Sequence, residues 1–157
     1  MIVYHASYTE VVHPNISFSR EALDFGKGFY LTTIREQALK YAEKFKLRGK
    51  RAVLNTYELD DQWRNTARTR RFGSYDEEWL DFVAANRSGA ATEPYDAVEG
   101  GIANDKVFRT LDLYFSGDIG KEEALRRLVY EKPNHQICLL SQTLIDSRLT
   151  FLTAEEL

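Results

Sequence analysis

The sequence predicts an α+β fold in which helices are inserted between strands that pair out of sequential order. Short β-branched and aromatic segments occur near both ends of the chain, and segments of helical period lie between them. No internal repeat or low-complexity tract is present. The chain has 157 residues, 43% of them apolar, which suffices for a stable core, so we expect a single domain over residues 1–157.

The first third of the chain contains two predicted strands. Residues 2–8 (IVYHASY) are short, β-branched and aromatic, and the alternation places His5 on one face with Val3 and Ser7. Residues 51–59 (RAVLNTYEL) form the second strand by the same criteria.

A helix is predicted between these strands, over residues 33–45. Thr33 and Glu36 have the spacing of a capping box, and Gly49 supplies a stop. The apolar positions at helical spacing are Ala38, Tyr41, Ala42 and Phe45. This pattern predicts that Tyr41 faces inward.

The second half alternates between helices and strands. We expect a helix capped by Ser74, a strand ending in the glycine turn of VEGG, and a helix over 105–115 capped by Asn104. A further helix over 121–130 precedes strands over 135–141 and 148–152.

Composition limits the function classes. A formal charge of -3 and a pI near 5.7 give no general attraction to nucleic acid or anionic membranes. The single cysteine, Cys138, excludes an internal disulfide framework and is expected to be an inert core thiol. No histidine and carboxylate spacing suggests a metal site. The first ten residues lack a basic leader, and no apolar stretch approaches about 18 residues, so we expect a soluble, cytoplasmic protein without membrane contact.

Individual candidate residues each allow two interpretations. His5 could orient a ligand, although a lone strand histidine is more often structural. His135 is expected to lie exposed in a turn. An arginine-rich segment could contact phosphates, but the acidic residues flanking it favour an ion-paired surface. The arginines are Arg64, Arg68, Arg70 and Arg71.

Several motifs in combination resemble one enzyme family. They are YHAS at 4–7, FGKGFY at 25–30, a tyrosine eleven residues after Tyr30, and NHQICLL at 134–140. Together they resemble the diphtheria-toxin-like branch of the ADP-ribosyltransferases, which includes the poly(ADP-ribose) polymerases, and are most similar to bacterial domains of that superfamily. The resemblance implies an ADP-ribosyltransferase-like split β-sheet core, NAD as substrate and no metal.

The resemblance also implies roles for particular residues. His5 would hydrogen-bond a ribose hydroxyl, and Tyr30 and Tyr41 would stack on opposite sides of the nicotinamide ring. The implied NAD-binding set is His5, Ala6, Ser7, Gly26, Gly28, Tyr30 and Tyr41. The implied catalytic set is His5, Tyr30 and Gln136.

Two positions depart from the family pattern. Ala6 replaces the usual glycine after the histidine, where a Cβ could narrow the pocket. Gln136 replaces the glutamate that starts the late strand, and a neutral amide can orient a hydroxyl but cannot act as a base. Glu99 or Glu131 could supply a substitute carboxylate, although each is expected to be a surface charge.

The function expected from the resemblance is NAD-dependent mono-ADP-ribosyl transfer to a protein or nucleic acid. A bacterial toxin or defence effector with an antitoxin or immunity partner is the biological role expected. The first alternative is a catalytically silent module that binds NAD or ADP-ribose, which the replacement by Gln136 favours. The second is a nucleic-acid-contacting domain that uses the arginine segment.

Overall fold

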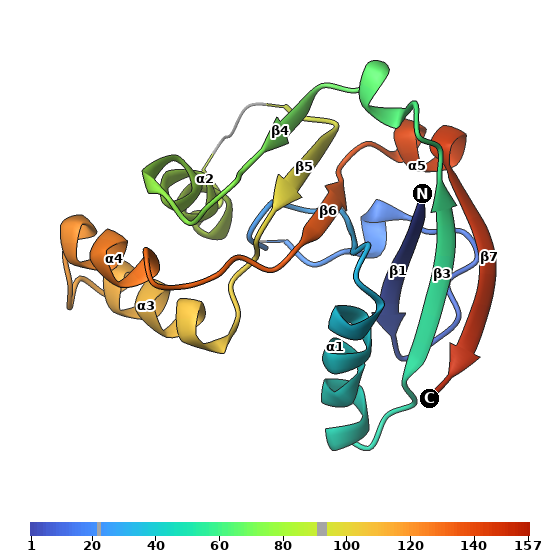
Figure 1. The fold of residues 1–157 in the computed structure, drawn as a ribbon, viewed down its shortest axis with the longest axis horizontal. Coiled ribbons are helices and arrows are strands. Elements are labelled where there is room, and N and C mark those ends of the chain that lie inside the picture. The colour runs from blue at the N-terminus through green and yellow to red at the C-terminus, as the bar shows by residue number, and fades with distance from the viewer. Residues whose placement is uncertain (22, 91–93) are drawn as a thin grey trace.

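The computed structural model describes residues 1–21, 23–90 and 94–157, which form a mixed structure of two β-sheets and five α-helices (Figure 1). The strands are β1 (Ile2–Ser7), β2 (Phe29–Leu31), β3 (Val53–Leu59), β4 (Thr69–Arg71), β5 (Ala97–Gly100), β6 (Gln136–Leu139) and β7 (Leu149–Glu156). The α-helices are α1 (Arg35–Leu47), α2 (Glu77–Ser88), α3 (Asp105–Phe115), α4 (Lys121–Leu128) and α5 (Gln142–Arg148). Two 3-10 helices are η1 (Ile16–Phe18) and η2 (Trp63–Asn65).

Strands distant in the sequence lie side by side in both sheets. The three-stranded sheet has the order β1-β3-β7, and both of its pairs are antiparallel. The four-stranded sheet has the order β2-β6-β5-β4, in which β4 and β5 are parallel and the other pairs are antiparallel. The predicted α+β class with non-sequential pairing is therefore confirmed.

The two sheets meet where β1 passes the end of β2. Tyr4 and Thr32 form an isolated antiparallel bridge in which each backbone N–H donates to the other residue's carbonyl, at 2.8 and 3.0 Å. This bridge brings the strand that carries His5 against the strand that carries Tyr30.

Apolar packing holds the layers together. One buried cluster lies between the four-stranded sheet and helices α2, α3 and α4, and Trp79, Leu80 and Leu111 are fully buried in it. A second cluster joins residues of both sheets, including Val3 of β1 and Ile137 of β6. Figure 1 shows the same layering, with α2, α3 and α4 on one side of β5 and β6 and the three-stranded sheet on the other.

The structure corrects several local predictions. Asp76, and not Ser74, caps α2, because its carboxylate accepts from the backbone N–H of Trp79 at 2.9 Å. The cap of α1 is also different, since Ile34 occupies that position and no side chain caps it. The predicted cap of α3 is confirmed, because Asn104 accepts from the N–H of Val107 at 2.9 Å. Strand β4 and helix α5 were not predicted.

Within the residues described, no helix is both long and apolar enough to cross a lipid bilayer.

Candidate functional site at the junction of the two sheets

His5 projects from β1 and binds the backbone of β2. Its Nδ1 lies 2.8 Å from the carbonyl oxygen of Tyr30, and a carbonyl can only accept, so Nδ1 carries the proton. The ring packs on Phe29 with a centroid separation of 4.3 Å. Burial lowers the pKa of His5, and the hydrogen bond to Tyr30 only partly opposes that effect. The imidazole is therefore mainly neutral at pH 7, with Nε2 as a hydrogen-bond acceptor.

The two residues after His5 are buried in the same strand. Ala6 is 6% exposed and packs with Ala42 of α1 and Ala52. Its methyl group is thus occupied in the contact between β1 and α1, on the face of β1 opposite His5. The substitution of alanine for glycine at this position consequently fills a packing contact. Ser7 is 9% exposed and pairs with Val53 of β3.

The turn before β2 requires glycine at two positions. Gly26 has a φ of 98°, a conformation that L-residues with a side chain rarely adopt. A Cβ on Gly28 would lie 2.6 Å from the Sγ of Cys138 and 2.7 Å from the carbonyl oxygen of Leu139. The glycines therefore let the turn cross β6 at close range. Cys138 itself is fully buried, as predicted.

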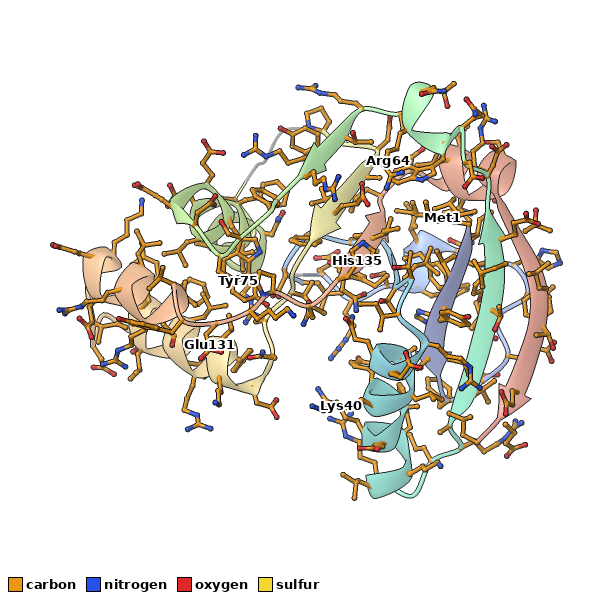
Figure 2. The ribbon with its side chains drawn as sticks, in the orientation of Figure 1. Met1, Lys40, Arg64, Tyr75, Glu131 and His135 are labelled. Carbon is orange, nitrogen blue, oxygen red and sulfur yellow. The ribbon has the colours of Figure 1, made fainter. Side chains whose placement is uncertain are left out.

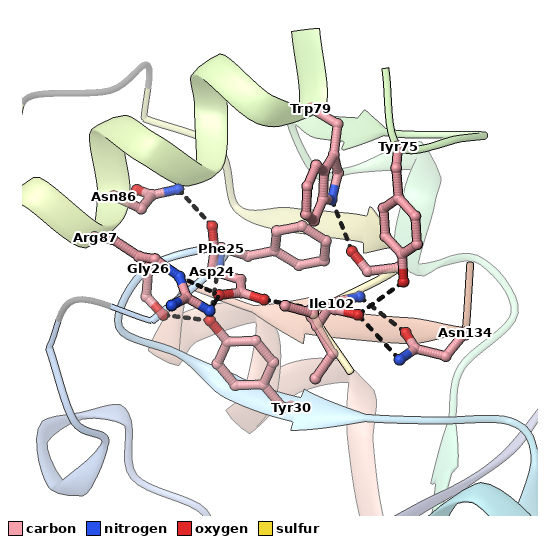
Figure 3. Close-up of polar contacts among 12 residues, drawn as sticks. Asp24, Phe25, Gly26, Tyr30, Tyr75, Trp79, Asn86, Arg87, Ile102 and Asn134 are labelled. Carbon is pink, nitrogen blue, oxygen red and sulfur yellow. Dashed lines mark hydrogen bonds and ion pairs between the residues drawn. The ribbon is translucent and has the colours of Figure 1, made fainter. Parts of the chain in front are cut away.

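Tyr30 locks this turn through its hydroxyl group. Its Oη donates to the carbonyl of Gly26 at 2.6 Å and accepts from the N–H of Phe25 at 3.1 Å, as Figure 3 shows. Burial raises the pKa of the Tyr30 phenol far above its usual value, so the hydroxyl stays protonated. Both hydrogen bonds of the hydroxyl are therefore made to backbone atoms of the turn. The half-buried ring lies nearly parallel to the ring of Phe25, with centroids 6.5 Å apart.

A buried ion pair that the sequence did not reveal anchors the same turn. Asp24 is 7% exposed, and its carboxylate accepts from Arg87 of α2 at 2.7 Å and from the N–H of Ala103 at 2.7 Å. Asn86 also donates to the Asp24 carbonyl at 3.0 Å (Figure 3). The turn that carries Gly26 is thus tied to α2 and to the loop after β5. Asp24 and Arg87 are 63 residues apart, so no local pattern signals their contact.

Tyr41 does not face inward as predicted. Its side chain is 43% exposed, because α1 packs on β1 through the small residues Ala38 and Ala42. The ring is flanked on its own helix by Phe45, at 5.8 Å between centroids, and by the Lys44 ammonium, 5.1 Å from the ring centroid. An exposed ring of this kind leaves apolar surface for contact with a ligand.

Gln37 places the start of β6 against α1. Its side-chain amide donates to the carbonyl of His135 at 2.7 Å and accepts from the N–H of His135 at 3.0 Å. Gln37 and Tyr41 are four residues apart and therefore share a face of the helix. The face of α1 that carries Tyr41 is thereby held beside the segment that leads into Gln136. No local pattern in the sequence marks Gln37 for this role.

Gln136 and Tyr30 lie on the same face of the four-stranded sheet. Tyr30 pairs with Cys138 across the β2–β6 ladder, and Gln136 lies two residues before Cys138 on β6. Figure 1 shows α1, β1 and the start of β6 gathered in one region of the molecule. The strands that carry His5, Tyr30 and Gln136 thus meet at the junction of the two sheets, with Tyr41 on the adjoining helix. The His5 ring packs on Phe29, which alternates with Tyr30, so it lies on the sheet face opposite Tyr30 and Gln136.

Glu99 is buried, which contradicts its prediction as a surface charge. It is 4% exposed and accepts two hydrogen bonds from Arg64, at 2.7 and 3.0 Å. Burial raises the pKa of Glu99, but the nearby His135 and Arg64 groups outweigh this effect and lower it to about 2. Glu99 pairs with Ile137, so its side chain points to the sheet face opposite Gln136. Its ionised carboxylate is already engaged and does not point toward the face that carries Gln136.

His135 also differs from its prediction as an exposed turn residue. The ring is half-buried, with Nδ1 3.3 Å from the Thr33 hydroxyl and Nε2 3.9 Å from a Glu99 carboxylate oxygen. The second distance is an electrostatic contact and is too long for a hydrogen bond. Figure 2 shows His135 at the segment leading into β6, whereas Glu131 lies toward α3 and α4.

The arginine-rich segment has several structural roles. Arg64 binds the buried Glu99 and lies over the ring of Trp63, whereas Arg70 pairs with the exposed Glu78. Arg68 lies over the ring of Tyr95 at 5.3 Å. The predicted ion-paired surface is thus correct for Arg70, whereas Arg64 completes a buried pair. Arg71 remains at the edge of a pocket.

In the part of the chain that the structure describes, no three histidine, cysteine, aspartate or glutamate side chains gather as a metal-binding group.

Comparison with known proteins places the chain in a family without assigning it an activity. Residues 1–151 match the model of a family described as "Protein of unknown function (DUF3990)", and the chain belongs to that family. Neither the curated proteins nor the solved structures contain a significant match.

Proposed function

We propose that this chain is an NAD-dependent mono-ADP-ribosyltransferase that transfers ADP-ribose from NAD to a protein or nucleic acid. The observation that carries the proposal is His5, whose Nδ1 is held by the Tyr30 carbonyl and whose Nε2 is therefore an acceptor. A neutral imidazole in this tautomer suits a ribose hydroxyl as its donor. The motif resemblance described above supplies the choice of NAD.

The tyrosines support binding of a flat ring in different ways. Tyr41 offers a ring that is 43% exposed, and stacking on nicotinamide would contribute about 1 to 2 kcal/mol. Tyr30 contributes a half-buried ring and, through its hydroxyl, the shape of the glycine turn. In this proposal Tyr30 is primarily a wall of the site, because its hydroxyl is already engaged.

The proposed reaction breaks the bond between the nicotinamide nitrogen and C1 of the ribose. The electron pair of that bond leaves with nicotinamide, which becomes neutral, and the ribose develops oxocarbenium character. The acceptor then donates an electron pair to C1 and loses its proton to solvent. The amide of Gln136 orients a ribose hydroxyl during these steps but adds no negative charge.

A catalytically silent NAD-binding module is the second candidate, and Gln136 is the observation that favours it. Glu99 does not compensate, because Arg64 engages both of its oxygens on the opposite sheet face. Under this candidate, the protein binds NAD or ADP-ribose and presents it to a partner without turnover.

Incubation of the full chain with labelled NAD separates the candidates. Transfer or hydrolysis supports the enzyme, binding without turnover supports the silent module, and no binding refutes both. Gln136→Glu would place a charge roughly 4 to 5 Å from the developing cation, worth at most about 4 kcal/mol. Because desolvation reduces that value, we expect NAD hydrolysis to rise roughly 10- to 1000-fold. The matched control is Gln62→Glu on the exposed surface, which should leave the rate unchanged.

His5→Ala tests the observation on which the proposal rests. It should weaken NAD binding and turnover, whereas His13→Ala, at an exposed position, should alter neither. A folded His5→Ala protein with unchanged NAD affinity would remove His5 from the site. Mass spectrometry of bacterial extract treated with the protein and NAD would identify the acceptor and show whether a toxin-like role fits.

A further inference from the structure

A cavity of about 250 Å³ lies where β4 and β5 end and β6 begins. Its lining includes Arg71 after β4, Glu99 on β5, and Lys132 and His135 before β6. None of the residues proposed to bind NAD lines it. Glu99 points to the sheet face opposite Gln136, but the cavity is also lined by Gly100, which pairs with Gln136. The cavity therefore adjoins the start of β6 and has a lining of its own.

The cavity is electropositive although its wall contains a buried carboxylate. Glu99 is neutralised by Arg64, which engages both carboxylate oxygens. Arg71 and Lys132 are exposed. Among the described residues, neither has an ion-pair partner within 4 Å. The charge of Arg71 acts on Glu99 only through longer-range electrostatics, which lower the pKa of Glu99. Arg64 cancels the charge of Glu99, so the two remaining cations, Arg71 and Lys132, leave a net charge of about +2 at the cavity.

We propose that this cavity binds a phosphate group, either as free phosphate or as the phosphomonoester of a nucleotide. A phosphate dianion matches the two excess positive charges, and the planar guanidinium of Arg71 can bind two of its oxygens at once. Lys132 approaches from a separate segment and supplies a second charge. The volume accommodates a phosphate with part of an attached sugar.

The Glu99–Arg64 ion pair lies at the cavity, and Glu99 forms part of its lining. Each oxygen of Glu99 already accepts a hydrogen bond from Arg64, and no ion pair within 4 Å joins Glu99 to Arg71 among the described residues. Figure 2 shows that Arg64 and His135 reach this region from separate segments of the chain. The inference goes beyond the proposed transferase function and does not require NAD to bind.

Titration of the full chain with inorganic phosphate, and separately with adenosine monophosphate, tests the proposal by calorimetry. We expect saturable binding, weakened about tenfold by Arg71→Gln and by Lys132→Gln, since each removes a charge-assisted contact. Both side chains are exposed, so the variants should fold as the parent does. Arg109→Gln and Lys106→Gln on the exposed side of α3 change the net charge equally and are the matched controls.

Comparison of the two ligands shows whether the phosphate comes from a nucleotide or from the free anion. Binding of either ligand supports the proposal, provided that the Arg71 and Lys132 variants weaken it as expected. Tighter binding of adenosine monophosphate assigns the cavity to a nucleotide, and binding of inorganic phosphate alone assigns it to the free anion. Absence of binding of both ligands up to about 10 mM would overturn the proposal. So would equal weakening by the α3 controls, because the effect would then be general attraction.

Discussion

Replacement of Glu99 by glutamine tests the buried ion pair at the end of β5. The pKa of Glu99 is lowered from an ordinary 4.5 to about 2. A difference of this size corresponds to roughly 3 kcal/mol of folding free energy at neutral pH. Glu99→Gln should therefore reduce the free energy of unfolding by about that amount. Arg64 is 41% exposed and can be hydrated, so no isolated buried charge adds to the loss.

The pH dependence gives this prediction its sign. The folded-state pKa is depressed, so the stabilisation is present above pH 4.5 and is lost as the pH falls toward 2. For a single group with these values, the difference between parent and variant should shrink from about 3 kcal/mol at pH 7 to about 1.4 kcal/mol at pH 3. Urea unfolding followed by tryptophan fluorescence measures this difference, since Trp63 is fully buried beneath Arg64.

A matched variant separates this effect from general charge removal. Glu78 pairs with Arg70 at the surface, where its side chain is 74% exposed. Glu78→Gln should change the stability very little, because exposed ion pairs contribute little. A parent-to-variant difference for Glu99→Gln that stays constant from pH 7 to pH 3 would refute the linkage argument.

Three further predictions concern the proposed site. Gly28→Ala should destabilise the fold by about 1 to 3 kcal/mol in chemical denaturation, because the added Cβ would meet the Cys138 sulfur at 2.6 Å; Gly73→Ala, with nothing within 4 Å, should not. Tyr41→Ala should leave the melting temperature nearly unchanged, given its 43% exposure, and weaken NAD binding roughly tenfold in calorimetry. Cys138 should react with a disulfide reagent only after unfolding, because burial raises the pKa of its thiol; rapid modification of the native protein would contradict this.

Local patterns in the sequence were sufficient for the larger elements. The helical spacing around Ala38 and Ala42 predicted α1, and Asn104 marked the start of α3. In α2, Trp79 and Val83 are four residues apart, which is a helical spacing, and both are fully buried. These elements carry their own start signals and apolar stripes.

Features that depend on distant partners were not predicted. Strand β4 has three residues, Thr69–Arg71, and exists because it pairs with β5 after an intervening helix. Helix α5 spans only seven residues, too few for a helical period to be distinguished from the neighbouring strands. The sequence predicts a surface charge at Glu99 because its partner, Arg64, lies 35 residues away and leaves no local signal.

The error at Tyr41 came from residue size. Tyr41 has the same helical spacing as the buried Ala38 and Ala42. Those small side chains let α1 pack closely on β1, and the larger ring of Tyr41 is left at the edge of this contact, exposed to solvent. Gln37, which binds the His135 backbone, was overlooked because a glutamine on a helix surface has no local signature.

The position of β7 has a consequence for folding during synthesis. β3 lies between β1, which ends about 45 residues before it, and β7, which begins about 90 residues after it. At roughly 5 to 20 residues per second, the ribosome needs about 5 to 20 seconds to produce that partner. Throughout this interval one edge of β3 has unpaired backbone groups on the nascent chain. The three-stranded sheet is therefore among the last parts of the molecule to be completed, and β3 is the segment most exposed to mispairing before then.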